Sequence, residues 1–167
     1  QRPSDIDLIV SGASVPYQPI PATAPLIMRS LGIPDGTAAA FDVNSTCLSF
    51  ISALDAAALM IDNGKVRRAL VVSSEIASRA LPWEEQPEVA ALFGDGAAAF
   101  VLGSADTASP SAIKAVRLRS YPSVFEACGI GSGGTRYDFE AEHDAFVANT
   151  KFTMDGKVLF RLTAQKF

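Results

Sequence analysis

Cys47 is the residue of this sequence best suited to covalent chemistry. It lies in "FDVNSTCLSF" (residues 41–50), after an apolar, strand-like segment and at the start of a long segment with helical periodicity. Asn44, Ser45 and Thr46 are candidate N-caps for that helix. A thiol at a helix N-terminus lies near the positive end of the dipole, which favours the thiolate. Cys47 is therefore either a nucleophile for acyl groups or a small core residue, as most free cysteines are.

His143 is the natural candidate for a catalytic partner, because it is the single histidine of the sequence. A Cys–His pair would be an acyl-transfer centre. However, His143 lies in "EAEHDAF", between Glu142 and Asp144, and this stretch is typical of an exposed charged segment. We therefore do not place His143 in the site.

Two glycine-rich stretches could indicate ligand binding, but both have simpler interpretations. In "LFGDGAAAF" (residues 92–100), the glycines around Asp95 precede a strand and not a helix, so they do not predict a nucleotide site. We interpret Asp95 as part of a structural turn. "GSGG" (residues 131–134) could surround a phosphate, and we interpret it as a flexible loop.

The surrounding pattern predicts an α/β fold with a mostly parallel or mixed sheet covered by helices. Strands are expected at residues 6–12, 37–43, 67–75, 94–103 and 111–121. Helices are expected within residues 21–34, with a stop at Gly32, within residues 47–64, with a stop at Asn63-Gly64, and at residues 154–167. The last two strands, joined through the polar residues 104–110, are expected to pair antiparallel and close the edge of the sheet.

The sequence between residues 122 and 153 has no sustained period, which favours a loop that covers a site. We therefore expect residues 1–120 to form the main α/β part and residues 121–153 a loop or insertion over the substrate channel. Residues 154–167 are expected to begin a helix that leads to a further part of the protein.

Composition excludes several function classes. The chain has 167 residues, 49% of them hydrophobic, and a formal net charge of −4 without a basic stripe, so we expect no nucleic-acid partner. Every apolar run is interrupted before the roughly 20 residues of a membrane span. Two cysteines are too few for a disulfide framework, and a reducing, cytoplasmic setting is expected.

Taken together, these motifs resemble β-ketoacyl-acyl-carrier-protein synthase III and its relatives in the thiolase superfamily. The segments that carry the resemblance are "DIDLIVSGAS", "PATAPLIMRSLGI", "FDVNSTCLSF", "ALVVSSEIASR", "LFGDGAAAFVL" and "MDGKVLFRL". They cover nearly the whole chain and are weakest across residues 121–152. The resemblance implies a thiolase-like fold, of which this chain would carry one incomplete half and part of the next segment.

The resemblance also implies roles for individual residues. Cys47 matches the nucleophile that accepts an acyl group from coenzyme A or acyl-carrier protein, and its own N–H would form part of an oxyanion hole. Ile20 matches a position that closes the acyl pocket of a dimer partner. Phe93 and Met154 match positions that line the substrate channel. The strand at residues 38–43 matches the one that pairs across a homodimer, and no cofactor is implied.

Three departures from the family pattern qualify these expectations. Ser49 replaces the usual glycine two residues after the cysteine, and "EEQPEVAAL" has no arginine where coenzyme A-loading relatives carry one. The family's histidine and asparagine motifs, "HQAN"-like and "GNTS"-like, do not occur in the sequence. We therefore expect these residues to accept an acyl group on Cys47 but not to condense it without a further part of the enzyme.

The leading hypothesis is thus a ketosynthase-type acyltransferase of fatty-acid or lipid metabolism, forming a carbon–carbon bond by Claisen condensation. A thioesterase or acyltransferase on the same scaffold, and a non-condensing partner subunit of a heterodimer, stay open as alternatives. The thiol of Cys47 favours an enzyme over the partner subunit, because such a subunit has no use for it.

Overall fold

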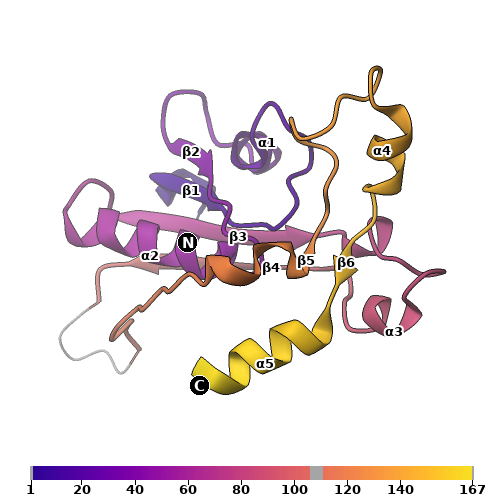
Figure 1. Cartoon of the computed structure of the whole chain (residues 1–167). Coiled ribbons are helices and arrows are strands. Elements are labelled where there is room, and N and C mark those ends of the chain that lie inside the picture. Colours follow the sequence, from indigo (N-terminus) through magenta and orange to yellow (C-terminus); the bar gives the residue numbers. More distant parts are fainter. Residues whose placement is uncertain (1, 106–110, 167) are drawn as a thin grey trace. The chain divides into compact units, whose positions relative to one another are not determined.

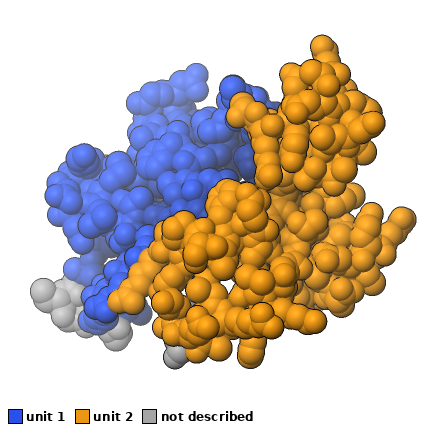
Figure 2. All heavy atoms as spheres, in the orientation of Figure 1, with its two compact units in different colours: residues 1–75, 96–118 blue, residues 76–95, 119–167 orange. Residues whose placement is uncertain are grey.

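The computed structural model describes residues 2–105 and 111–166, which form two compact units (Figure 2). The first unit comprises residues 1–75 and 96–118, and the second comprises residues 76–95 and 119–167. The helices and strands are labelled in Figure 1. In the first unit they are β1 (Leu8–Ser11), α1 (Thr23–Ser30), β2 (Ala39–Asp42), α2 (Ser49–Asp62), β3 (Arg68–Glu75) and β4 (Gly96–Gly103).

The sheet of the first unit has the strand order β2-β1-β3-β4. β1 pairs in parallel with both β2 and β3, and β4 pairs antiparallel with β3. The predicted βαβ units and the mixed sheet are therefore confirmed. β1 is central and buried along its whole length, which explains why its sequence is a continuous apolar run and not an alternating one.

The two helices cover opposite faces of β1. Ala53, Ala57 and Ile61, spaced at about one helical turn on α2, pack with Leu8 and Val10. On the other face, Ile9 packs with the α1 residue Ala24 and with Ile6 and Ile33. Small alanines at the contacts let the helices approach the sheet closely.

α1 and α2 both end just before the glycines that the sequence marks as helix stops. α1 and α2 are each followed by a glycine with positive φ, Gly32 at 66° and Gly64 at 68°, a conformation that glycine adopts at no steric cost. The N-terminus of α1 is capped from outside the helix, because the Asp42 carboxylate accepts hydrogen bonds from the N–H groups of Thr23 and Ala24, both at 2.7 Å. This contact joins the end of β2 to the start of α1.

The strand predicted at residues 111–121 is wrong. In the part of the chain that the structure describes, this segment is in no strand, and β4 forms that edge of the sheet. Ile113 and Leu118 are 43% and 46% exposed, so the large apolar side chains that favoured a strand here are not buried. An alternating pattern needs a partner strand to become a ladder. The predicted connection at residues 104–110 lies mostly outside the described residues.

The second unit contains short elements where the sequence predicted mainly irregular structure. They are the 3-10 helices η2 (Ala77–Arg79) and η3 (Pro122–Ala127), the helices α3 (Pro87–Ala90) and α4 (His143–Ala148), and the strands β5 (Cys128–Gly129) and β6 (Thr153–Met154). β5 and β6 pair antiparallel. These elements are too short to create a sustained period in the sequence, and for that reason the prediction missed them.

The helix expected at residues 154–167 is confirmed as α5 (Gly156–Lys166). Its first turn is capped by the Asp155 carboxylate, which accepts hydrogen bonds from the N–H groups of Lys157 and Val158. Val158 and Leu159 on the predicted apolar face are half-buried, and Phe167 lies outside the described residues. Within residues 2–105 and 111–166, none of the helices is long and apolar enough to cross a membrane.

Candidate active site

Cys47 is exposed and lies in a tight turn between the end of β2 and the start of α2. The helix begins at Ser49 and not at Cys47, so the predicted start was two residues too early. Thr46 is the reason, because its φ of 53° takes the chain out of a helical path immediately before Cys47. Positive φ is rare for a β-branched residue, so the turn must be held by its surroundings.

Asn44 and Ser49 hold this turn from its two sides. The Asn44 side chain accepts a hydrogen bond from the Thr46 N–H at 2.9 Å and donates one to the Ser14 carbonyl at 3.1 Å. The Ser49 hydroxyl accepts a hydrogen bond from the Ser45 N–H at 2.9 Å and donates one to the Thr46 carbonyl at 2.6 Å. None of Asn44, Ser45 and Thr46 caps α2 with its side chain, contrary to the expectation. Leu48 occupies the N-cap position, and its side chain makes no capping hydrogen bond.

The backbone N–H of Cys47 is left available by this arrangement. The Leu48 N–H donates to the Ser45 carbonyl at 3.1 Å, and the Ser49 N–H donates to the Thr46 carbonyl at 3.0 Å. The Ser45 and Thr46 N–H groups donate to side chains. Of the five backbone N–H groups of residues 45–49, that of Cys47 therefore has no acceptor among the described residues. A free N–H on the residue that carries an exposed thiol can supply one donor of an oxyanion hole.

Gly12, directly after β1, fixes where the first turn of α2 can lie. A Cβ at this position would come within 2.6 Å of the Ser49 carbonyl oxygen and within 2.9 Å of the Ala53 Cβ. No side chain fits there, so β1 and the start of α2 can approach closely only because residue 12 is glycine. The predicted strand end at Gly12 thus also determines the position of the Cys47 turn.

Ile20, the second predicted site residue, lies in the loop between β1 and α1 and is 86% exposed. Its carbonyl accepts a hydrogen bond from the Gln18 side-chain amide at 2.9 Å. The peptide bond from Ile20 to Pro21 is cis. A large apolar side chain this exposed is available to a partner molecule, and its role in closing a partner's pocket stays a prediction.

Phe93 and Met154 both lie in the second unit, on segments that contact each other. The Phe93 ring packs edge-on against the Phe152 ring, with centroids 5.2 Å apart and an interplanar angle of 72°. The Gln86 side chain accepts a hydrogen bond from the Met154 N–H at 3.4 Å. The structure therefore brings the predicted channel residues onto neighbouring segments. Phe152 was missed, because nothing in the sequence marks it as a partner of Phe93.

Asp95 has the structural role that its glycine neighbours indicated. Its carboxylate accepts hydrogen bonds from the Ser78 N–H at 2.8 Å and from the Ser78 hydroxyl at 2.7 Å. The backbone N–H of Ser78 is the largest cause, and the Ser78 hydroxyl the next, that holds the pKa of Asp95 below its ordinary value. The Ser78 carbonyl in turn accepts a hydrogen bond from the Trp83 indole at 2.9 Å, so Asp95 secures the segment after β3.

His143 and the "GSGG" segment are both occupied by local contacts in the second unit. His143 is exposed at the start of α4, and its ring packs edge-on against Phe139, with centroids 4.9 Å apart. The N–H groups of Gly131 and Ser132 both donate to the Asn149 carbonyl at 3.0 Å, so these two are not free to bind a phosphate. In the described part of the chain, no His, Cys, Asp and Glu side chains form a group that could hold a metal ion.

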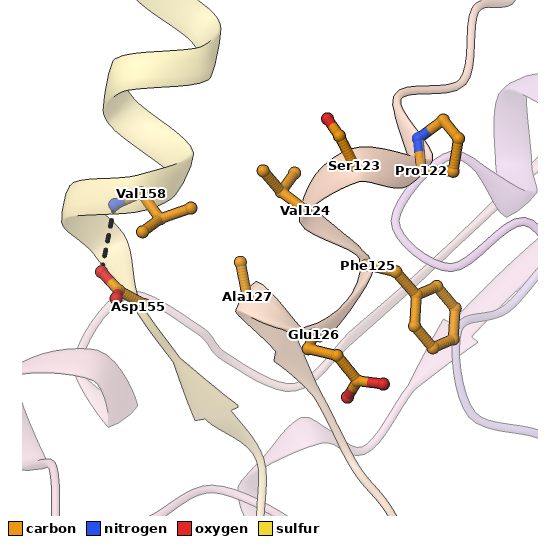
Figure 3. A pocket seen from close by; sticks show the side chains of 8 residues that line it. All are labelled: Pro122, Ser123, Val124, Phe125, Glu126, Ala127, Asp155 and Val158. Carbon is orange, nitrogen blue, oxygen red and sulfur yellow. Dashed lines mark hydrogen bonds between the residues drawn. The ribbon is translucent and has the colours of Figure 1, made fainter.

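An open hollow of about 400 Å³ lies in the second unit, between η3 and the start of α5. The side chains that line it are drawn in Figure 3. It is lined by Pro122, Ser123, Val124, Phe125, Glu126, Ala127, Asp155 and Val158. None of the candidate site residues is among them. The hollow therefore adds nothing to the candidate site around Cys47.

The chain is similar to proteins of one family in both sequence and fold. The family model described as 3-oxoacyl-[acyl-carrier-protein (ACP)] synthase III matches residues 41–122. "Beta-ketoacyl-[acyl-carrier-protein] synthase III 3" of Streptomyces coelicolor is 33% identical over 164 residues, which are 98% of this chain and 48% of that protein. The corresponding synthase III of Brucella suis is 43% identical over 122 residues, 71% of this chain and 37% of that protein.

Among solved structures, 3-oxoacyl-(acyl carrier protein) synthase III of Pseudomonas aeruginosa PAO1 has a TM-score of 0.76 and 30% identity to this chain. The match covers 94% of this chain and 44% of that protein. The chain thus spans half the length or less of these relatives.

Proposed function

Because this chain belongs with the 3-oxoacyl-[acyl-carrier-protein] synthase III-like condensing enzymes of the thiolase superfamily, we propose that Cys47 is the nucleophile of a ketosynthase-type acyltransferase. The observation that carries the proposal is the turn after β2, in which an exposed thiol and an unpaired backbone N–H belong to the same residue.

The proposed acylation is a transfer between two thioesters. The Cys47 thiolate attacks the carbonyl carbon of an acyl thioester, and the carbonyl oxygen becomes an oxyanion that accepts a hydrogen bond from the Cys47 N–H. When the tetrahedral intermediate collapses, the bond from carbon to the carrier's sulfur breaks. The carrier leaves as a thiolate and takes up a proton, so the acyl group is left on Cys47.

In the proposed second half-reaction, the carbanion of a second acyl thioester attacks the Cys47 acyl group. A carbon–carbon bond forms, and the Cys47 thiolate is released. The names of the relatives, which describe synthesis of a β-ketoacyl group on acyl-carrier protein, support acyl-carrier protein as a substrate and fatty-acid biosynthesis as the setting. Acyl-CoA is proposed as a further acyl donor from the family resemblance of the Cys47 segment. Residues beyond those in this sequence would complete the site for this step.

Intact-mass measurement after incubation with a panel of acyl-CoA and acyl-carrier-protein thioesters tests the acylation. We expect the wild type to gain the mass of one acyl group and Cys47→Ala to gain none. Cys128→Ala is the matched control, because Cys128 is the other free cysteine and is half-buried, so this variant is expected to gain the same mass as the wild type. Acylation of Cys47→Ala, or no acylation of the wild type by any thioester, refutes the proposal.

We further propose that Phe93 and Met154 line the path of the acyl chain. Their support is the contact between their segments, since Phe152 packs on Phe93 and Gln86 contacts Met154. Phe93→Ala is expected to shift the preferred acyl length in the same mass assay. An unchanged preference across the thioester panel counts against this role.

A homodimer through residues 38–43 is also proposed. β2 is the edge strand of the sheet, and the N–H groups of Ala39 and Val43 donate inward to β1 and its neighbours, to Asp7 and Ser11. By alternation, the Ala40 N–H faces outward, where a second copy could pair with it. Ala40→Pro removes this outward donor and is expected to give a monomer by light scattering. A variant that remains dimeric argues against this edge as the interface.

The cytoplasmic location is proposed on weaker support, namely that both cysteines are free. Fractionation of cells that produce the protein, with antibody detection, tests it. Recovery in an oxidising compartment would overturn this proposal without affecting the role of Cys47.

A further inference from the structure

Ser49 is a buried polar residue that contacts the Cys47 turn. It is 1% exposed and is the first residue of α2. The hydroxyl accepts one hydrogen bond, from the Ser45 N–H, and donates one, to the Thr46 carbonyl, so its hydrogen is fully used. Buried hydroxyls with complete partners fix the geometry of the groups that they contact.

The two backbone groups that Ser49 binds flank the strained residue of the turn. Thr46 has a φ of 53°. The Thr46 carbonyl lies in the peptide unit that follows this residue, and the Ser45 N–H lies one residue before it. If the hydroxyl is removed, the Ser45 N–H loses its acceptor, and the Thr46 carbonyl keeps only the Ser49 N–H. Thr46 could then relax toward negative φ, which would rotate the N–H of Cys47.

Ser49 itself is held in place by its contact with β1. The closest approach is at Gly12, where a Cβ would be only 2.6 Å from the Ser49 carbonyl oxygen, so the first turn of α2 packs directly on the backbone after β1. Ser49 is therefore fixed to the sheet core, while Cys47, two residues earlier, is exposed. Through Ser49, the rigid core determines the conformation of an exposed turn.

From these contacts we infer that Ser49 is a positioning residue for acylation. Its hydroxyl holds the turn so that the free N–H of Cys47 lies where an oxyanion forms as Sγ attacks. The inference rests on the proposed function of Cys47. It assigns a role to the serine that stands where the family resemblance implies glycine, and it explains how this chain keeps a non-glycine residue, Thr46, at positive φ.

The test compares Ser49→Ala with the wild type in three measurements. The first is the acylation rate of Cys47 at saturating thioester, which is expected to fall about tenfold to a hundredfold, the range for misplacing one oxyanion donor, while the half-saturating concentration changes little. The second is alkylation of Cys47 by iodoacetamide, which needs no oxyanion hole and is expected to stay near the wild-type rate. The third is hydrogen exchange of the Ser45 amide, expected to accelerate about fivefold or more on losing one hydrogen bond.

Two further variants make the comparison specific. Ser52→Ala removes a hydroxyl one turn further along α2. Ser52 binds the start of the helix through its backbone N–H, which donates to the Leu48 carbonyl at 2.9 Å and is kept in the variant, so Ser52→Ala is expected to match the wild type in all three measurements. Ser49→Gly lacks the hydroxyl as Ser49→Ala does and serves as the second test variant. Melting temperatures show that each variant is folded.

The outcomes separate this inference from the proposed function. Wild-type acylation and wild-type Ser45 exchange in both Ser49 variants overturn the inference, as does an equal loss of acylation and alkylation, which indicates general loosening. If the wild type accepts no acyl group, the proposed function fails. The exchange of the Ser45 amide then still decides whether Ser49 holds the turn.

Discussion

Gly12→Ala is the most informative single substitution outside the Cys47 turn. The added Cβ would lie 2.6 Å from the Ser49 carbonyl oxygen and 2.9 Å from the Ser49 carbonyl carbon and the Ala53 Cβ. These neighbours are backbone atoms and a core alanine, so no flexible side chain can move aside. To reach the 3.4 Å of an ordinary contact, the start of α2 must move away from β1 by roughly 0.8 Å.

This displacement has two measurable consequences. Overpacking of this kind costs about 1–3 kcal/mol, and in a chain of this size about 1 kcal/mol lowers Tm by about 2–4 °C. Because the shift acts on Ser49, it also moves the Cys47 turn, and a misplacement near 1 Å can cost about a hundredfold in rate. We therefore expect a Tm lower by about 3–10 °C and a large loss of Cys47 acylation.

Thermal unfolding by circular dichroism and the acyl-mass assay measure the two effects. Gly96→Ala is the control, because it also introduces a Cβ at a glycine of the first unit, but one with no atom within 4 Å. The control is expected to keep the wild-type Tm. The steric reasoning is refuted if Gly12→Ala is as stable and as readily acylated as Gly96→Ala.

Three further predictions concern contacts within each of the two units. Asp42→Ala removes the carboxylate that caps α1 and is expected to lower the free energy of unfolding by about 1–2 kcal/mol in urea titrations, whereas an unchanged midpoint would show that the cap is dispensable. The pKa of Asp95 is lowered, so its ionised form stabilises the fold above its ordinary value of 3.8, and this contribution is lost as the pH falls through the lowered value. The Tm advantage of the wild type over Asp95→Asn should accordingly shrink between pH 7 and pH 3, and a constant difference contradicts the role of the carboxylate. A double-mutant cycle of Phe93→Ala and Phe152→Ala should give a coupling of about 0.5–1.5 kcal/mol, and additive effects would exclude an edge-to-face contribution.

The sequence predicted the first unit well because its signals are local. Apolar residues recur every three or four positions along residues 47–64, which reflects the period of a helix, and the continuous apolar run of β1 reflects burial on both faces. Which residues of α2 enter the core, Ala53, Ala57 and Ile61, came from the structure. The Gly32 and Gly64 stops depend on the φ of a single residue. By the same reasoning the second unit was poorly predicted, because its short elements are stabilised by contacts between distant residues.

The false strand at residues 111–121 shows the limit of such patterns. Alternation states which side chains share a face, but the ladder also needs a partner with free N–H and carbonyl groups in register. The sequence does not contain that information in any short segment. Ile113 and Leu118 of this segment therefore stay largely exposed.

The sequence by itself determined that a cysteine lies at a strand-to-helix turn of an α/β fold, because periodicity and residue type are properties of neighbouring residues. Only the tertiary structure decided that the Cys47 N–H is free. That property arises from a buried hydroxyl, a glycine directly after β1 and a threonine at positive φ, which act on one another through space. Ser49 was noticed in the sequence as a departure from a family pattern, and its two hydrogen bonds gave that departure a physical reason.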